Sequence, residues 1–364
     1  MRVLLIVADG KPGGGTTHVL QILQGLRHAV SFHLITEQDS YLMREVTALG
    51  ISCHGLQFFI SRFNVLLPFQ LRKIVSVIQP DLVHLHGGRA GFFFVLSFLK
   101  VPMVYTIHGF HFVGKPLIHR WMAMLVERLI IQRSNCAMFV SGYDLELAEK
   151  YHLVAEDALC AVIHPGLSCN DLPRAFPNSL RHIGFVGRLE YQKDPLLFLE
   201  MIEFLPEYSA TVVGGGTLEP SMKQTIENRG LGERVRMVGQ LSHQEALKIL
   251  ATLGAIILPS RWEGLPILVL EAMGIGVPVI SMKVSGLEEI IRNGINGMLV
   301  ERRSGEDLAK QVERVTKDEV LRASIIETAK KTVQGQFSME KMLASILNIY
   351  KEHSISHLTP LRGK

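Results

Sequence analysis

The sequence predicts an α/β protein with two doubly wound parallel sheets, and three observations support this class. At 364 residues, 48% hydrophobic and 20% charged, the chain is long enough for two well-filled cores. Short apolar runs alternate with stretches of helical apolar spacing along the whole chain. Apolar runs without polar alternation are typical of parallel strands that helices cover on both faces.

The first half is expected to form one such domain, over residues 1–165. A helix is expected at His18–Leu26. The Pro- and Asn-bearing stretch 166–180 is the best candidate for a linker. The expected strands are Val3–Val7, Val30–Ile35, Leu82–Leu85, Met103–Ile107, Cys136–Val140 and Cys160–Ile163.

The second half repeats the pattern over residues 181–337, and an amphipathic helix follows at about Ser338–His353. Its expected strands are Ile183–Val186, Ala210–Val213, Val235–Val238, Ala255–Leu258, Pro278–Ile280 and Met298–Val300.

Charge and cysteine usage narrow the functional classes. The four cysteines have no close-pair spacing and the N-terminus lacks an export signal, so we expect a cytoplasmic protein without disulfides or a cysteine metal site. Residues 58–134 hold nine Lys/Arg, two acids and ten of the seventeen phenylalanines. This window indicates either peripheral binding to an anionic membrane or a core at Phe92–Phe94 and Phe98 with charges that solvate helices. Nucleic-acid binding is disfavoured because no such motif accompanies the charge.

The most informative segment is residues 263–271, in which Glu263 and Glu271 frame an apolar run. Glu263 is expected on a loop at a strand's carboxyl end, and Glu271 inside the helix that follows. Ligands of open parallel sheets bind at the carboxyl ends of strands. Carboxylates that face such a crevice accept hydrogen bonds from a polyhydroxyl ligand.

Cations and glycines follow other strands of the same half. Arg188 and Lys193 could neutralise a diphosphate, although a strand-end arginine is more often a surface ion pair. Small residues let a ligand approach the backbone; they include Gly187, the Gly214–Gly216 triplet, Gly239 and Gly286. Together these residues describe a sugar-nucleotide pocket.

The first half carries histidines and a glycine-rich loop at its strand ends. Gly13–Gly15 follow the first strand but do not match the dinucleotide fingerprint. A metal site at His84 and His86 is conceivable, but we favour a buried, hydrogen-bonded His84 and a hydrogen-bonding His108 in the cleft; His111 lies nearby in sequence. No Asp-x-Asp occurs, so we expect no metal cofactor and assign charge neutralisation to Arg188 and Lys193.

The chain resembles the retaining glycosyltransferases of the GT-B fold, family 4 (glycosyl transferases group 1). The resemblance covers nearly the whole chain and is strongest from 183 to 300. It rests on motifs at Glu263-x7-Glu271, Gly187-Arg-Leu-Glu-Tyr-Gln-Lys193, Val213–Gly216, Val238-Gly239, Gly286–Ile290, Asn293–Gly297 and the N-terminal glycine loop.

The resemblance implies two Rossmann-like domains that face a central cleft, with the C-terminal segment 338–364 packing back on the first domain. Glu263 and His108 would lie beside the transferred sugar, Glu271 would bind the ribose, and Arg188 and Lys193 the diphosphate. Gly14 and Gly15 would border the acceptor or the phosphates. The remaining donor contacts would come from Met237–Gln240 and from Gly187, Gly215, Gly239, Gly264, Leu265, Pro266, Ile267 and Leu268.

The implied activity is a retaining, metal-independent transfer of a hexosyl-type group from a UDP- or GDP-sugar to a glycan or lipid-linked acceptor, in polysaccharide, lipopolysaccharide or glycolipid assembly. Two departures are the hinge His164-Pro-Gly166, where relatives commonly have Pro-Asn-Gly, and Leu265, where they often have Phe. The alternatives are a GT-B epimerase or phosphorylase, a Rossmann oxidoreductase and a non-catalytic sugar-nucleotide binder.

Overall fold

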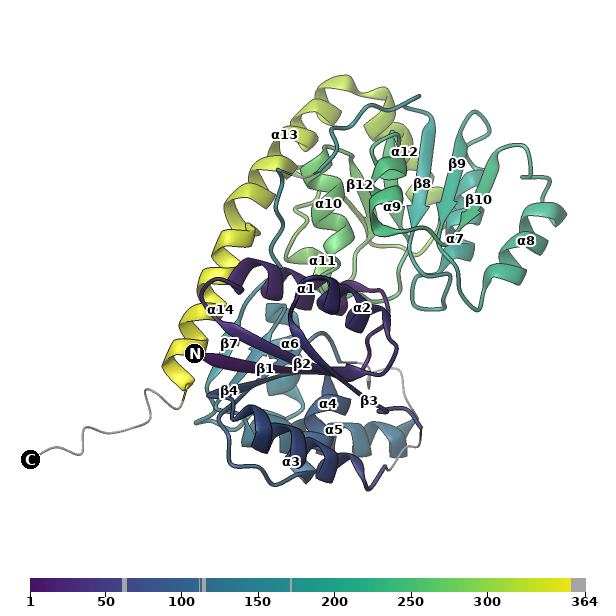
Figure 1. Cartoon of the computed structure of the whole chain (residues 1–364). Coiled ribbons are helices and arrows are strands. Elements are labelled where there is room, and N and C mark those ends of the chain that lie inside the picture. Colours follow the sequence, from purple (N-terminus) through teal and green to yellow (C-terminus); the bar gives the residue numbers. More distant parts are fainter. Residues whose placement is uncertain (61–63, 111, 113–115, 171, 355–364) are drawn as a thin grey trace, which may run out of the picture. The chain divides into compact units, whose positions relative to one another are not determined.

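The chain folds into two α/β units, each with one parallel sheet (Figure 1). The computed structural model describes residues 1–60, 64–110, 112, 116–170 and 172–354. Unit 1 comprises Met1–Gly166 and the segment from Glu340 onward, and unit 2 comprises Leu167–Met339. Of the residues discussed above, His111 and the parts of 58–134, 166–180 and 338–364 at 61–63, 113–115, 171 and 355–364 lie outside the described part. No helix of that part is long and apolar enough to cross a membrane.

Unit 1 contains a seven-stranded sheet in the order β3-β2-β1-β4-β5-β6-β7. Its strands are β1 (Arg2–Val7), β2 (Ser31–Glu37), β3 (Ser52–Leu56), β4 (Leu82–His86), β5 (Met103–Ile107), β6 (Cys136–Phe139) and β7 (Cys160–Val162). Six strands were predicted within two residues at each end; β3 was missed because this edge strand is only partly buried.

Helices cover both faces of this sheet, with α1 and α2 on one face and α3, α4 and α5 on the other (Figure 1). They are α1 (Gly14–Leu26), α2 (Tyr41–Ala48), α3 (Leu67–Ile78), α4 (Gly88–Leu96), α5 (Leu117–Arg133) and α6 (Gly142–Lys150). The C-terminal helix α14 (Met339–His353) also belongs to this unit, because the buried Tyr350 hydroxyl bonds His84 Nδ1 at 2.6 Å.

Unit 2 contains a six-stranded sheet in the order β10-β9-β8-β11-β12-β13. Its strands are β8 (His182–Val186), β9 (Ser209–Val213), β10 (Val235–Gly239), β11 (Ala255–Leu258), β12 (Val279–Met282) and β13 (Met298–Val300). All six coincide with predicted strands to within two residues. Its helices are α7 (Pro195–Glu203), α8 (Glu219–Asn228), α9 (His243–Leu250), α10 (Ile267–Ile275), α11 (Ser285–Glu288), α12 (Gly305–Lys317) and α13 (Glu319–Gln336).

The stretch 166–180 divides between the units rather than standing apart as a linker. Gly166 belongs to unit 1, whereas Leu167 is buried in unit 2. The Leu167 amide donates to the Phe337 carbonyl at 2.8 Å, and the Phe176 amide donates to the Ala251 carbonyl at the same distance. Apolar side chains and backbone hydrogen bonds therefore hold this proline-containing stretch against unit 2.

Candidate functional site

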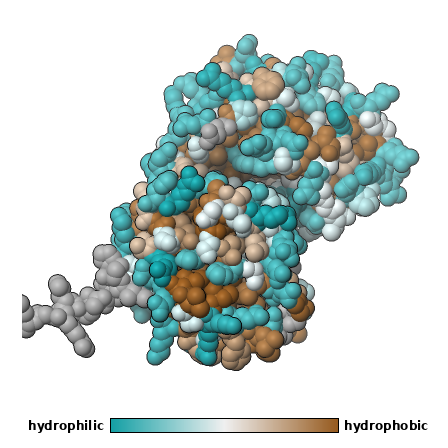
Figure 2. Space-filling model, viewed as in Figure 1, coloured by the Kyte–Doolittle hydropathy of each residue, from teal (hydrophilic) through white to brown (hydrophobic). Residues whose placement is uncertain are grey.

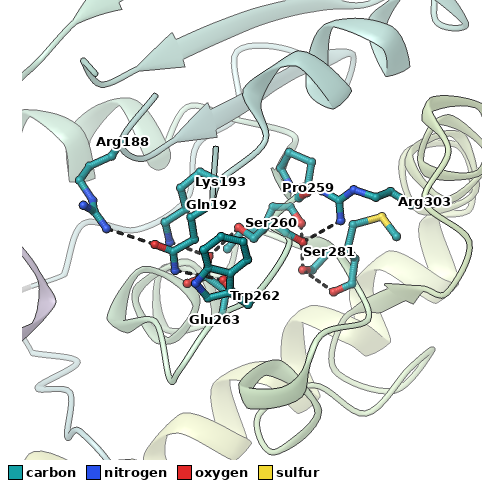
Figure 3. A network of polar contacts seen from close by, with 11 residues as sticks. Arg188, Gln192, Lys193, Pro259, Ser260, Trp262, Glu263, Ser281 and Arg303 are labelled. Carbon is teal, nitrogen blue, oxygen red and sulfur yellow. Dashed lines mark hydrogen bonds and ion pairs between the residues drawn. The ribbon is translucent and has the colours of Figure 1, made fainter. Parts of the chain in front are cut away.

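The strand order of unit 2 reverses between β8 and β11, and the predicted residues Arg188, Lys193, Glu263 and Glu271 follow these two strands. Crevices at such switch points are where open α/β sheets bind ligands. Two hydrogen bonds join the loops: the Arg261 amide donates to the Gln192 carbonyl at 2.8 Å, and Gln192 Nε2 donates to the Trp262 carbonyl at 3.1 Å. The loop that carries Lys193 and the loop that carries Glu263 thus form one structure (Figure 3).

Lys193 and Glu263 form a buried ion pair at this switch point. Lys193 Nζ donates to Glu263 Oε1 at 2.5 Å, and Ser260 Oγ donates to the same oxygen at 2.6 Å. Glu263 is 6% exposed, so its charge depends on these two partners. Oε2 accepts no hydrogen bond from the described residues, which leaves an acceptor for a ligand hydroxyl. The sequence assigned the two residues to different ligand groups; the structure joins them directly.

Arg188 differs from Lys193, because its side chain is exposed. Its guanidinium Nη2 donates to Gln192 Oε1 at 3.3 Å (Figure 3). The guanidinium therefore stands at the edge of the loop pair and presents its donors to solvent. This placement suits a side chain that pairs with the anionic part of a ligand.

Asp194, which the sequence did not indicate as a site residue, holds both loops in place. Asp194 Oδ2 accepts a hydrogen bond from Arg303 Nη2 at 2.5 Å and forms an ion pair with Arg261 Nη2 at 2.8 Å. Arg303 also donates to the carbonyls of Pro259 and Ser260, at 2.5 and 3.2 Å. Because Asp194 is buried and adjacent to Lys193, these bonds hold the lysine opposite Glu263. No local sequence pattern indicates this contact, because Arg303 lies 109 residues after Asp194 in the chain.

Glu271 also has a partner that sequence reasoning missed. It lies in α10, is 5% exposed and accepts a hydrogen bond from His243 Nε2 at 2.7 Å. The bond to Glu271 raises the His243 pKa, and the carboxylate charge adds to it, although desolvation acts the other way. His243 opens α9 after the capping residue Ser242, and that serine-to-glutamate capping box was the available signal for its position.

Two of the predicted site glycines are required by packing between loops. A Cβ at Gly214, where φ is +137°, would stand 1.9 Å from the Gly187 carbonyl oxygen. A Cβ at Gly286 would stand 1.5 Å from the Gly264 carbonyl oxygen. These positions therefore let strand-end loops cross at backbone distance. In contrast, a Cβ at Gly215 would meet only ordinary contacts near 3.7 Å, so packing does not explain that glycine.

The remaining predicted donor residues surround the start of α10 and the end of β10. Pro266 is the N-cap of α10, and Ile267 begins the helix. Leu265 and Ile267 are buried, Leu268 is half-buried, and Gly239 ends β10 with φ +76°. The first helical amides thus lie next to the Glu263 loop.

The switch point of unit 1, between β1 and β4, carries a cluster of histidines instead of ion pairs. His86 Nδ1 lies 3.0 Å from His108 Nε2, and the two rings are stacked with centroids 5.3 Å apart. His18, from α1, lies with its ring centroid 5.3 Å from that of His108. Gly15 borders the cluster: a Cβ there would come to 3.8 Å from the His108 ring. Gly14 begins α1.

Burial keeps His18, His84 and His86 neutral. Desolvation lowers the pKa of His84 to about 3, and it lowers the pKa of His18 and His86 well below 6.5. The expectation of a satisfied His84 is confirmed, since its ring also bonds Thr106 Oγ1 at 2.6 Å. Within the described residues, no group of three or more His, Cys, Asp or Glu side chains is arranged to hold a metal ion.

Two family models match the chain, one for each unit. Residues 12–171 match the model described as Glycosyltransferase Family 4, and residues 173–332 match Glycosyl transferases group 1. An Escherichia coli protein named UDP-Gal:alpha-D-GlcNAc-diphosphoundecaprenol alpha-1,3-galactosyltransferase is 26% identical over 307 residues, which cover 77% of each chain. The Escherichia coli O-antigen biosynthesis glycosyltransferase WbnH is 26% identical over 321 residues, 87% of this chain and 90% of WbnH.

Solved structures share the fold. Alr3699/HepE of Anabaena in complex with UDP and glucose superposes with a TM-score of 0.83 at 18% identity, covering 96% of this chain and 99% of the other. Sucrose-phosphate synthase of Thermosynechococcus elongatus gives a TM-score of 0.84 at 18% identity, covering 96% and 98%. Two parallel-sheet units with these matches define the GT-B class. The chain is a glycosyltransferase of the GT-B type.

Proposed function

We propose that this enzyme transfers a hexosyl-type group from a UDP- or GDP-sugar to a hydroxyl of a glycan or lipid-linked acceptor, with retention of configuration and as a family 4 member. The observation that carries the donor assignment is the buried Lys193–Glu263 pair with the exposed Arg188 beside it. Glu263 would accept hydrogen bonds from the transferred sugar, Glu271 would bind the ribose, and the two cations would face the diphosphate.

The proposed reaction balances without a protein nucleophile. The bond between the anomeric carbon and the phosphate oxygen breaks, and the acceptor oxygen bonds to that carbon on the same face. The acceptor's proton passes to the departing phosphate oxygen, while Arg188 and Lys193 stabilise its charge. No metal is assigned to this step. Turnover unchanged in excess EDTA would support that assignment, whereas a complete loss that magnesium restores would overturn it.

A thermal-shift screen of UDP- and GDP-sugars, followed by turnover with the best donor, tests the function. We expect one donor to raise the melting temperature and to yield a product in which the glycosyl group is joined to an acceptor. The anomeric configuration follows from NMR coupling constants of that product. An epimerised or phosphorolysed sugar without transfer, or no binding of any nucleotide sugar, would contradict the proposal.

The acceptor side is proposed to contact an anionic membrane surface through α5, in polysaccharide, lipopolysaccharide or glycolipid assembly. Figure 2 shows apolar side chains on the exposed surface of unit 1. Exposed on α5 are Leu117, Ile118, Trp121, Met122, Leu125 and Leu129, and its cations include Arg128 and Arg133. Of the alternative core at Phe92–Phe94 and Phe98, Phe93 and Phe94 are buried and Phe92 is half-buried, but Phe98 is exposed. Phe59 and Phe69 are exposed as well. Apolar side chains among cations suit an anionic interface.

Liposome flotation tests the membrane surface. We expect the enzyme to float with anionic vesicles at low salt, and we expect the double variant Trp121→Ser/Leu125→Ser to remain in solution. Val320→Ser is the matched control, because Val320 is equally exposed but lies on α13 in unit 2. Flotation that is absent in the wild-type protein, or equal in all variants, would favour a soluble acceptor.

A further inference from the structure

Two aromatic side chains stand exposed on the two loops that form the switch point of unit 2. Tyr191 is 62% exposed and lies two residues before Lys193, while Trp262 is 41% exposed and immediately precedes Glu263. Their ring centroids are 6.0 Å apart, with the planes inclined by 55°. The rings thus form one angled aromatic surface next to the buried ion pair. None of the roles described above accounts for them.

Contacts hold the Tyr191 ring and the Trp262 backbone in place. The Arg261 guanidinium carbon lies 4.3 Å from the centroid of the Tyr191 ring, and Asp194 fixes that guanidinium at 2.8 Å. Gln192 Nε2 donates to the Trp262 carbonyl at 3.1 Å (Figure 3). Exposed rings that are already positioned lose little conformational freedom when a ligand binds. These loops therefore keep two apolar rings exposed, which is typical of a binding surface.

The chemistry of this surface fits a sugar ring. Aromatic faces carry partial negative charge, and one face of a pyranose presents C–H groups with partial positive charge. Trp262 immediately precedes Glu263, which is assigned to the transferred sugar, so a pyranose stacked on these rings would lie next to that sugar. A nucleobase could also stack on an aromatic ring. However, the base region expected after β10 lies two strands away from β8, whereas Tyr191 and Trp262 follow β8 and β11 themselves.

We propose that Tyr191 and Trp262 form a subsite that stacks one pyranose ring of the acceptor glycan beside the Glu263–Lys193 pair. This inference rests on the proposed function, because it supplies the acceptor side of the same transfer. It also predicts that acceptors with a sugar at this position are preferred over simple alcohols.

The first experiment uses the tryptophan content, since Trp121 and Trp262 are the chain's two tryptophans. In the variant Trp121→Phe, Trp262 is the single tryptophan reporter. We expect methyl glycosides of glucose, galactose or N-acetylglucosamine, titrated with UDP already bound, to change its emission saturably. An emission change with UDP alone, and none with any glycoside up to about 100 mM, would assign the rings to the nucleotide and overturn the proposal.

The second experiment compares ring-retaining and ring-removing variants. Saturation-transfer NMR with the same glycosides should lose its signal in Tyr191→Leu/Trp262→Leu and keep it in Tyr191→Phe/Trp262→Phe. UDP affinity should stay within about twofold in both, because the nucleotide is assigned to Arg188, Lys193 and Glu271 and not to either ring. Phe204→Leu is the matched control, since Phe204 is a half-exposed aromatic of unit 2 at the far end of α7.

The outcomes separate this inference from the proposed function. If the wild-type enzyme uses no nucleotide sugar, the proposed function fails whatever the glycosides do. If it turns over a donor but the Leu double variant binds glycosides as the wild type does, the subsite alone is disproved. In the supporting case, the acceptor KM rises about tenfold or more in the Leu variant, while kcat and the donor KM change by less than about threefold.

Discussion

The switch points of the two units use the same topology for opposite chemistry. In unit 2, the loops after β8 and β11 bury paired charges, with Glu263 against Lys193 and Asp194 against two arginines. In unit 1, the corresponding region around β1 and β4 buries neutral imidazoles, among them His18, His84 and His86. Strand order therefore determines where a site can form, and the side chains at the strand ends determine what it can do.

The contrast has an electrostatic consequence. Buried ion pairs keep their charges only while both partners are present, so they depend on each other's side chain. Buried neutral histidines depend instead on the pH of the solution, because protonation would place a charge in a dry environment. Each unit should therefore be sensitive to a different perturbation.

Acid is expected to give the largest effect, and to act on unit 1. The folded-state pKa of its buried histidines lies below the unfolded value near 6.5, so the unfolded state binds more protons and stability falls as pH decreases below about 6.5. Together, three such imidazoles lower the free energy of unfolding by about 4 kcal/mol for each pH unit of acidification. For His84 this loss continues toward pH 3. Urea unfolding of Trp262→Phe, which reports unit 1 through Trp121, measures this slope.

His18→Leu provides the control for the acid effect. His18 is buried, and neither ring nitrogen has a hydrogen-bond partner among the described residues, so leucine should be tolerated at neutral pH. The pH slope of unit 1 should become shallower by about 1.4 kcal/mol per pH unit. An unchanged slope would mean that protonation of His18 does not contribute to the loss of stability in acid.

Removing one partner of the ion pair should give the next largest effect, in unit 2. Lys193→Ala leaves Glu263 buried without its cation, which costs about 3–5 kcal/mol. Lys193→Met/Glu263→Gln removes both charges and should recover most of that loss, although it would not recover activity. Trp262 fluorescence in a Trp121→Phe background follows the unfolding. Equal stability of the single and double variants would show that the buried charge is not the cause.

Arg188→Ala separates catalysis from stability. Because Arg188 is exposed and its hydrogen bond to Gln192 is long, its removal should change stability by less than about 0.5 kcal/mol. Turnover with the best nucleotide-sugar donor should still fall about a hundredfold or more, since a cation beside the leaving diphosphate is lost. Steady-state kinetics and thermal unfolding on the same preparation check both statements. Wild-type turnover would remove the proposed role.

The smallest effect concerns His243 and has the opposite pH sign to unit 1. Its pKa is raised by the bond to Glu271, so its contribution is fully present below about pH 6.5 and is lost as pH rises through the raised pKa. Because the side chain is about half exposed, the change should stay below about 1 kcal/mol. In His243→Gln, the free energy of unfolding of unit 2 should no longer show this decrease with rising pH. A decrease that persists in the variant must come from another titrating group.

The sequence predicted the architecture well because parallel strands carry their own signal. Each expected strand was found, since an apolar run between turn residues can be recognised locally. The edge strand β3 was missed because half-buried Ser52–Leu56 lacks such a run. The site could be predicted only as a set of separate residues.

Contacts between distant residues explain what was missed. Lys193 and Glu263 are 70 residues apart, and Asp194 and Arg303 are 109 apart, so no spacing rule relates them. His243 was missed because a histidine at a helix start is unremarkable until Glu271 is found opposite. Such pairings are properties of the fold, and they appear only when the strand order brings the loops together.

The bond between Tyr350 and His84 has a consequence for the order of biosynthesis. His84 belongs to a strand made early, but its partner lies near the end of the described chain, 266 residues later. Domains generally fold as units, starting at the N-terminus during synthesis. Here the residues of unit 2 emerge from the ribosome completely before the helix that finishes unit 1. Synthesis of unit 1 therefore begins first, but its fold is completed last.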